Sequence, residues 1–153
     1  MRTHAMGLLL LAASVVSLPA ADPVLGTWKL DPVKSRFRPG PAPTEQTRIY
    51  ESGPEGVKVS IITTFADGTA STIEHPANFD GKDYPVTGSR RAVAISLKKI
   101  DDRISESILK HAGKVIGHAR REVSEDGKTM TVSYKGIAAD GREVDNEAFY
   151  RRE

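Results

Sequence analysis

Asp-Gly dipeptides punctuate this chain between short runs rich in Val, Ile, Thr and Tyr. They lie at residues 67–68, 80–81, 126–127 and 140–141, and Ala112-Gly113 is a looser equivalent. A glycine at such a position supplies the positive φ that a two-residue hairpin turn requires. The pattern therefore predicts antiparallel strands joined in sequence by tight turns.

The runs between these turns predict the strands of an all-β protein. We place them at residues 25–31, 45–51, 57–65, 69–79, 91–99, 103–110, 115–123, 129–136 and 143–150. No long amphipathic helix follows Ala21. Sequential hairpins without a long crossover favour a closed barrel over a two-sheet sandwich, because closure removes exposed sheet edges. The predicted fold class is therefore all-β, an antiparallel up-and-down β-barrel of about eight to ten strands.

The first twenty residues form a separate unit. Arg2 and His4 precede an apolar run at 6–18, and Pro19-Ala20-Ala21 offers small residues for cleavage, as in a secretory signal peptide of bacterial type. The apolar run is shorter than the roughly 20 residues of a membrane-spanning helix. We predict a signal peptide at 1–20 and one domain at 21–153, periplasmic or secreted, with no membrane insertion after cleavage. The alternative is an uncleaved helix packed on the domain.

Composition excludes several partners and stabilising devices. The chain has no cysteine, so disulfides and cysteine metal sites are excluded, and the domain depends on its hydrophobic core. Without Arg2, the predicted domain keeps 21 of the 22 basic residues against 20 acidic ones. This near-neutral, interspersed charge gives no electrostatic footprint for nucleic acid or an anionic membrane.

The only tryptophan lies at the start of the first predicted strand, in Gly26-Thr27-Trp28. This stretch resembles the Gly-x-Trp signature of lipocalins and their calycin relatives, in which the tryptophan closes one end of the barrel beneath an arginine from a late strand. The resemblance implies that Gly26 and Trp28 form a structural barrel plug, with Arg151 or Arg152 packed on the ring. The Thr-Asp-Tyr motif, the cysteines and an obvious C-terminal helix of typical lipocalins are missing, so the resemblance is to a lipocalin-like barrel.

Two longer stretches of the sequence resemble a narrower group of proteins than the lipocalins. Residues 26–37, together with 80–88, are similar to a group of small exported bacterial proteins. That similarity runs over essentially the whole predicted domain, and it implies no activity.

The predicted turns determine which residues of the central strands share a face. A two-residue turn at Ala112-Gly113 sets Glu106 opposite Ala119 and diagonal to Arg121. A two-residue turn at 126–127 sets Arg121 opposite Val132 and Ala119 opposite Tyr134. The apolar residues predicted on this inward face are Ile104, Ile108, Val115, Ala119, Val123, Met130 and Val132. Glu106, Arg121 and Tyr134 are predicted among them.

These inward charges have two interpretations. A buried Glu106–Arg121 ion pair is the structural one, because an unpaired charge inside a barrel loses its hydration without compensation. In the other, Arg121 holds the carboxylate of an apolar ligand and Tyr134 donates a second hydrogen bond, as in the fatty-acid-binding barrels that this architecture resembles. A register error of one residue would place Arg121 in solvent instead.

The remaining polar residues add no catalytic or metal motif. Beyond the predicted leader, the histidines are His75, His111 and His118, and we interpret them as solvated surface residues because none lies at metal-ligand spacing. A two-residue turn at 140–141 would send Asp145 and Glu147 inward, so this connection is predicted to be longer or bulged. We assign no metal, no cofactor and no catalytic residue.

These observations predict an exported protein that holds a small apolar or amphipathic ligand in its barrel without chemistry. The alternative is a barrel filled with side chains, whose outer face or mouth loops bind another protein or the cell envelope. A third interpretation is an isomerase or hydrolase built on the Glu106–Arg121 pair. A cavity of roughly 300 Å³ or more would favour ligand binding over the filled barrel. We assign no oligomeric state.

Overall fold

A computed structural model of the chain describes residues 16–17, 21–92 and 94–153. These residues form strands and loops without a helix. The strands are β1 (Gly26–Leu30), β2 (Arg36–Arg38), β3 (Glu45–Gly53), β4 (Gly56–Thr64), β5 (Ala70–Pro76), β6 (Tyr84–Pro85), β7 (Ala94–Lys99), β8 (Ile104–His111), β9 (Lys114–Val123), β10 (Thr129–Ile137) and β11 (Glu143–Arg152). Most of the predicted signal peptide at 1–20 lies outside the described residues.

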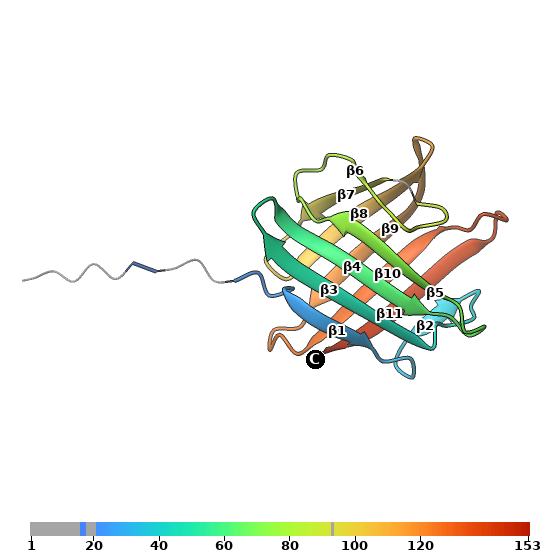
Figure 1. Cartoon of the computed structure of the whole chain (residues 1–153), viewed down its shortest axis with the longest axis horizontal. Helices are drawn as coiled ribbons and strands as arrows, with labels where there is room; N and C mark the ends of the chain where they lie inside the picture. Colours follow the sequence, from blue (N-terminus) through green and yellow to red (C-terminus); the bar gives the residue numbers. More distant parts are fainter. Residues whose placement is uncertain (1–15, 18–20, 93) are drawn as a thin grey trace, which may run out of the picture.

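The strands follow one antiparallel path that rolls into a nearly closed barrel (Figure 1). Their spatial order is β5-β4-β3-β1-β11-β10-β9-β8-β7-β6, with β2 off this path and paired to β11. The two ends of the path meet where Glu74 of β5 and Thr87 exchange backbone hydrogen bonds of 3.0 and 2.9 Å. This arrangement confirms the predicted all-β, up-and-down barrel.

The local sequence signals explain most of the strands. Each of the nine predicted strands is present with small changes at its ends. The two strands that the sequence patterns do not predict, β2 and β6, have only three and two residues. The glycines of the four Asp-Gly dipeptides all have φ between +70° and +85°, as the turn prediction requires.

One end of the barrel is filled around Trp28. This residue is fully buried, and its indole Nε1 donates a 2.8 Å hydrogen bond to the carbonyl of Val24. Val24, Val123 and Met130 belong to the same hydrophobic core and are also buried. These side chains fill one end of the barrel, and a cavity occupies the part of the interior that they do not fill.

The structure selects Arg152 as the arginine that packs on Trp28. Its Cζ lies 4.2 Å from the centroid of the indole ring, whereas Arg151 forms an ion pair of 3.1 Å with Asp31. The Arg152 guanidinium also donates hydrogen bonds to the backbone carbonyls of Gly127, Leu25 and Pro23. The last strand is thereby tied to the segment before β1 and to the β9–β10 turn.

Gly26 completes this arrangement because a side chain here would be strained and would displace the Arg152 guanidinium. Its φ is +121°, a conformation that residues with a side chain rarely adopt, and a Cβ built there would lie 2.8 Å from Arg152 Nη1. The Gly-x-Trp spacing therefore has a physical explanation in this chain: Trp28 fills the barrel end, and Gly26 leaves room for the arginine above it.

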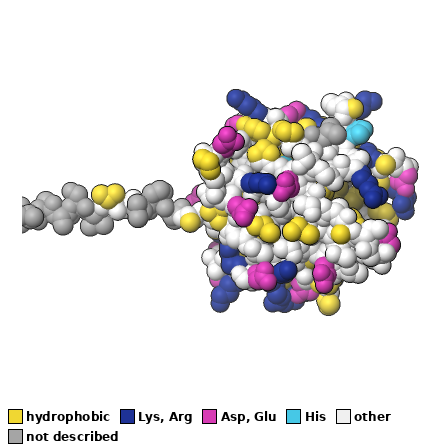
Figure 2. Space-filling view, viewed as in Figure 1, with side chains coloured by type: hydrophobic (Ala, Val, Ile, Leu, Met, Phe, Trp, Pro, Cys, Tyr) yellow, Lys and Arg dark blue, Asp and Glu magenta, His cyan; other side chains and the backbone are white. Residues whose placement is uncertain are grey.

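The outer surface carries mixed charge. Figure 2 shows acidic and basic side chains interspersed on the face in view. The part of the chain that the structure describes includes no helix long and apolar enough to cross a membrane.

Candidate functional site

A cavity of about 440 Å³ occupies the barrel interior. Alternate residues of a strand point to the same face, so every second residue of the long strands contributes to its wall. The aliphatic part of the wall consists of Val59, Ile61, Ile73, Val86, Ala92, Ile95, Leu97, Leu109, Ala119, Val132 and Ala148. Phe37, Pro41, Pro43 and Phe65, from β2 and the loops beside β3 and β4, add further apolar surface. The wall of the cavity is therefore mainly hydrophobic.

Two arginines line this cavity, whereas no Asp or Glu side chain lines it. Arg48 enters from β3 and Arg121 from β9. Every Asp and Glu of the sequence lies within the described residues, and none of them belongs to the cavity wall. Neither arginine takes part in any ion pair of the described residues. The cavity thus carries two positive charges without an acidic side chain to balance them.

Arg121 is the less satisfied of the two arginines. It is only 7% exposed, and its Nε and Nη2 have no hydrogen-bond partner within the described part of the chain. Its Cζ lies 5.2 Å from the ring centroid of Tyr50 and 5.8 Å from that of Phe79. Cation–π contacts of this kind offset only part of the cost of removing a guanidinium from water. Arg121 therefore has donors available for an anion in the cavity.

Arg48 is held in place by a polar network. Its Nε donates a 2.9 Å hydrogen bond to the hydroxyl of Tyr150, which in turn donates to Gln46 Oε1. The Gln46 amide donates to Thr63 Oγ1 at 2.9 Å. Burial disfavours the charged guanidinium, but the facing tyrosines Tyr150 and Tyr50 outweigh burial and raise the pKa of Arg48 above its usual value. Arg48 therefore remains a fixed cation with a set orientation.

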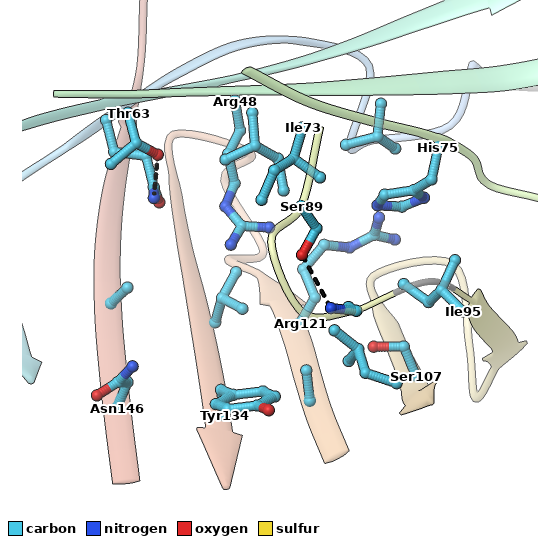
Figure 3. Close-up of a pocket in the computed structure, with 18 of the residues that line it drawn as sticks. Arg48, Thr63, Ile73, His75, Ser89, Ile95, Ser107, Arg121, Tyr134 and Asn146 are labelled. Carbon is cyan, nitrogen blue, oxygen red and sulfur yellow. Dashed lines mark hydrogen bonds between the residues drawn. The ribbon is translucent and has the colours of Figure 1, made fainter. Parts of the chain in front are cut away.

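His75 lies in the same cavity, so its interpretation as a solvated surface residue is wrong. It comes from the inward face of β5, and Figure 3 shows its ring above the Arg121 guanidinium. Its Nδ1 lies 2.9 Å from the carbonyl oxygen of Pro76, which it reaches as a donor in the neutral ring. Burial and the positive charges of Arg48 and Arg121 outweigh this hydrogen bond and lower the pKa of His75. The ring is therefore neutral near pH 7.

Glu106 does not lie in the cavity, so the predicted Glu106–Arg121 pair is wrong. The pairing of β8 with β9 starts as predicted, with His111 opposite Lys114, and then shifts by one residue at a bulge beside Leu109. This shift sets Ser105 opposite Arg121 and turns Glu106 outward, where it forms a 3.1 Å ion pair with Arg120. An outward carboxylate keeps its hydration, which an inward one would lose.

The bulge also reverses the other β8 residues. Ser105, Ser107 and Leu109 line the cavity in place of the predicted Ile104 and Ile108. Val115, predicted to face inward, is 52% exposed. An enzymatic site built on Glu106 and Arg121 together is incompatible with this register, because the two side chains lie on opposite faces of the sheet.

Tyr134 lines the cavity but is not adjacent to the Arg121 guanidinium. The β9–β10 register is as predicted, with Val132 opposite Arg121 and Tyr134 opposite Ala119. The Tyr134 ring covers Gly117 and Gly136, where a side chain would overlap it, and its hydroxyl lies 3.4 Å from the carbonyl oxygen of Ile116. In Figure 3 it stands well apart from Arg121.

The final hairpin explains how the cavity avoids further carboxylates. β10 and β11 are joined by the residues 138–142, a longer connection than two residues, as predicted. Tyr134 therefore faces Asn146 rather than Glu147. Asn146, Ala148 and Tyr150 point inward, and Asp145 and Glu147 point away from the cavity.

Comparison with known proteins adds no assignment to this geometry. No protein-family model matches the chain, and neither a curated protein nor a solved structure is significantly similar to it. Within the described residues, no group of three His, Cys, Asp or Glu side chains could hold a metal ion.

Proposed function

We propose that this protein is a lipocalin-like exported barrel that binds a small amphipathic anion in its cavity. The observation that carries the proposal is Arg121, a buried guanidinium with unpartnered Nε and Nη2 in a cavity without carboxylates. Apolar walls suit the tail of such a ligand, and a guanidinium suits a carboxylate or phosphate head group. The binding step involves no chemical change in the ligand.

The size of the cavity supports ligand binding over the alternative of a filled barrel. At about 440 Å³ it lies within the range of small-molecule pockets, roughly 300–1,000 Å³. A barrel that served only as a scaffold for an outer interaction surface would be more stable with this space filled. The charged interior also supports ligand binding. An unpaired buried arginine lowers the stability of the fold, so a role in binding an anion explains its presence.

Replacing Arg121 with glutamine tests the proposal. We expect Arg121→Gln to weaken binding of a fluorescent fatty acid by about 1.5–3 kcal/mol, the contribution of a hydrogen bond to a charged group. The free variant should be at least as stable as the wild type, because the substitution removes a desolvated charge whose cost exceeds that of the lost cation–π contacts. Fluorescence titration and thermal unfolding measure the two effects.

Arg120→Gln is the matched control. Arg120 is the neighbouring residue of β9, and it faces outward to Glu106. Its replacement should leave fatty-acid binding unchanged. Equal binding by wild type and Arg121→Gln would contradict the assigned role of Arg121, and failure of the wild type to bind any amphipathic anion would contradict the function itself.

A further inference from the structure

We infer that the bound head group carries two negative charges, which Arg48 and Arg121 recognise together. This inference rests on the proposed function and narrows its ligand class. The two arginines come from β3 and β9, which are separated in the barrel by β1, β11 and β10. Figure 3 shows both guanidinium groups reaching into the same space, with His75 and Ser89 beside them.

The charge balance of the cavity supports a dianion over a monoanion. Two guanidinium groups share one cavity with no carboxylate in its wall. Both also lie close enough to His75 to act on its titration, which places their charges around one centre. Charges interact strongly in such a poorly solvated space, so a single negative charge would leave one arginine without a counterion.

The free donors of Arg121 favour a compact head group with several oxygens. Nε and Nη2 lie on one edge of a guanidinium, and together they can donate two parallel hydrogen bonds to two oxygens of one anion. Arg48 uses its Nε to bind Tyr150, which fixes the plane of its guanidinium. A phosphate monoester meets these requirements, and so do two carboxylates on one carbon, because both place two charges and several oxygens on a small head group.

Two pairs of ligands with matched tails test the inference. Decyl phosphate is a dianion at pH 8, whereas decyl sulfate has the same shape and one charge. Decylmalonate and dodecanoate form the corresponding carboxylate pair. Binding of each ligand to the purified protein is measured by calorimetry at micromolar concentration and pH 8, where His75 is neutral.

We expect the wild type to bind the dianion of at least one pair about tenfold or more tightly than its monoanionic partner, the effect of one additional charged hydrogen bond. In Arg48→Gln this ratio should fall toward one, and in Arg120→Gln it should stay as in the wild type. The two pairs distinguish a phosphate head group from a dicarboxylate.

The other outcomes separate the inference from the function on which it rests. If the monoanions bind as tightly as the dianions, the dianion inference is overturned and the proposed function remains. If none of the four ligands binds, the proposed function itself fails. The comparison within the wild type requires no variant, so it holds even where Arg48→Gln disturbs the Tyr150 network.

Discussion

His75 shows how strongly one side chain can depend on its surroundings in this barrel. Burial, together with Arg48 from β3 and Arg121 from β9, lowers its pKa, and no carboxylate of the cavity wall opposes them. An unfolded chain lacks these effects and binds the proton near pH 6.5. The unfolded state therefore takes up a proton at a higher pH than the folded state does.

This difference predicts a loss of stability in mild acid. As the pH falls below about 6.5, the unfolded state is favoured by its greater proton uptake, so the unfolding free energy of the ligand-free wild type should decrease. His75→Gln, which keeps a donor for the Pro76 carbonyl, should show a smaller decrease between pH 7 and 5. Urea unfolding at several pH values measures both proteins, and parallel curves would contradict the placement of His75 beside the arginines in the cavity.

Ligand binding should raise the pKa of His75, whereas the surroundings in the empty cavity lower it. An anion between Arg48 and Arg121 supplies the negative charge that the empty cavity lacks, so the pKa of His75 should rise when the cavity is occupied. Binding would then become tighter as the pH falls toward the range where the ring takes up a proton. NMR titration of His75 in the free and bound protein tests this linkage.

Among the elements, the β8–β9 hairpin has a turn, Ala112-Gly113, whose first residue does not suit its backbone conformation. Ala112 has φ of +47° and Gly113 has φ of +78°, so both central residues adopt the left-handed conformation. Glycine adopts it without strain, whereas alanine does so at a cost of roughly 1–2 kcal/mol. The hairpin forms because strand pairing and burial outweigh this local strain.

Replacing Ala112 with asparagine should relieve the strain. Asparagine tolerates positive φ, and Asn-Gly is the preferred sequence of this turn type. We expect Ala112→Asn to stabilise the protein by about 0.5–1 kcal/mol in urea unfolding. Ala112→Val, with a branched side chain at the same position, should destabilise it. A destabilised Ala112→Asn would show that the turn has a different conformation.

Turn chemistry and alternation predict the elements but not every register. The β9–β10 register follows directly from Asp126-Gly127, so the inward positions of Arg121 and Tyr134 are predictable. The bulge in β9 does not follow from the turns: Val115 pairs with Lys110 and Gly117 with Leu109, so Ile116 is the extra residue, and this one-residue shift moves Glu106 to the outer face. Gly117 is a local signal for it, because a glycine inside a strand often marks a bulge. Arg48 and His75 are harder to predict for another reason: short turns set the β3–β4 and β4–β5 registers, but polar residues occupy inward positions of β3 and β5, so the alternation of apolar residues does not identify the inner face.

At the scale of the whole molecule, the barrel interior consists of a filled end and a cavity. Trp28, Val123 and Met130 fill one end, while Arg48 and Arg121 lie in the cavity of the remaining interior. Without a cysteine, the chain depends on its core and hydrogen bonds to support the uncompensated charges. The filled end must therefore contribute a large share of the total stability.

The Trp28 end should accordingly be the most sensitive part of the fold. We expect Trp28→Ala to reduce the unfolding free energy by about 3–5 kcal/mol, as for other large buried aromatic residues. Arg152→Gln should also destabilise the protein, because it removes the cation stacked on Trp28 and its bonds to three backbone carbonyls. Arg151→Gln is the matched control, since it removes an ion pair with Asp31 and an exposed cation–π contact with Phe149, each worth about 0–1 kcal/mol. Thermal and urea unfolding of the three variants gives the ranking, and a Trp28→Ala variant that melts with the wild type would refute the role of this end as the support of the barrel.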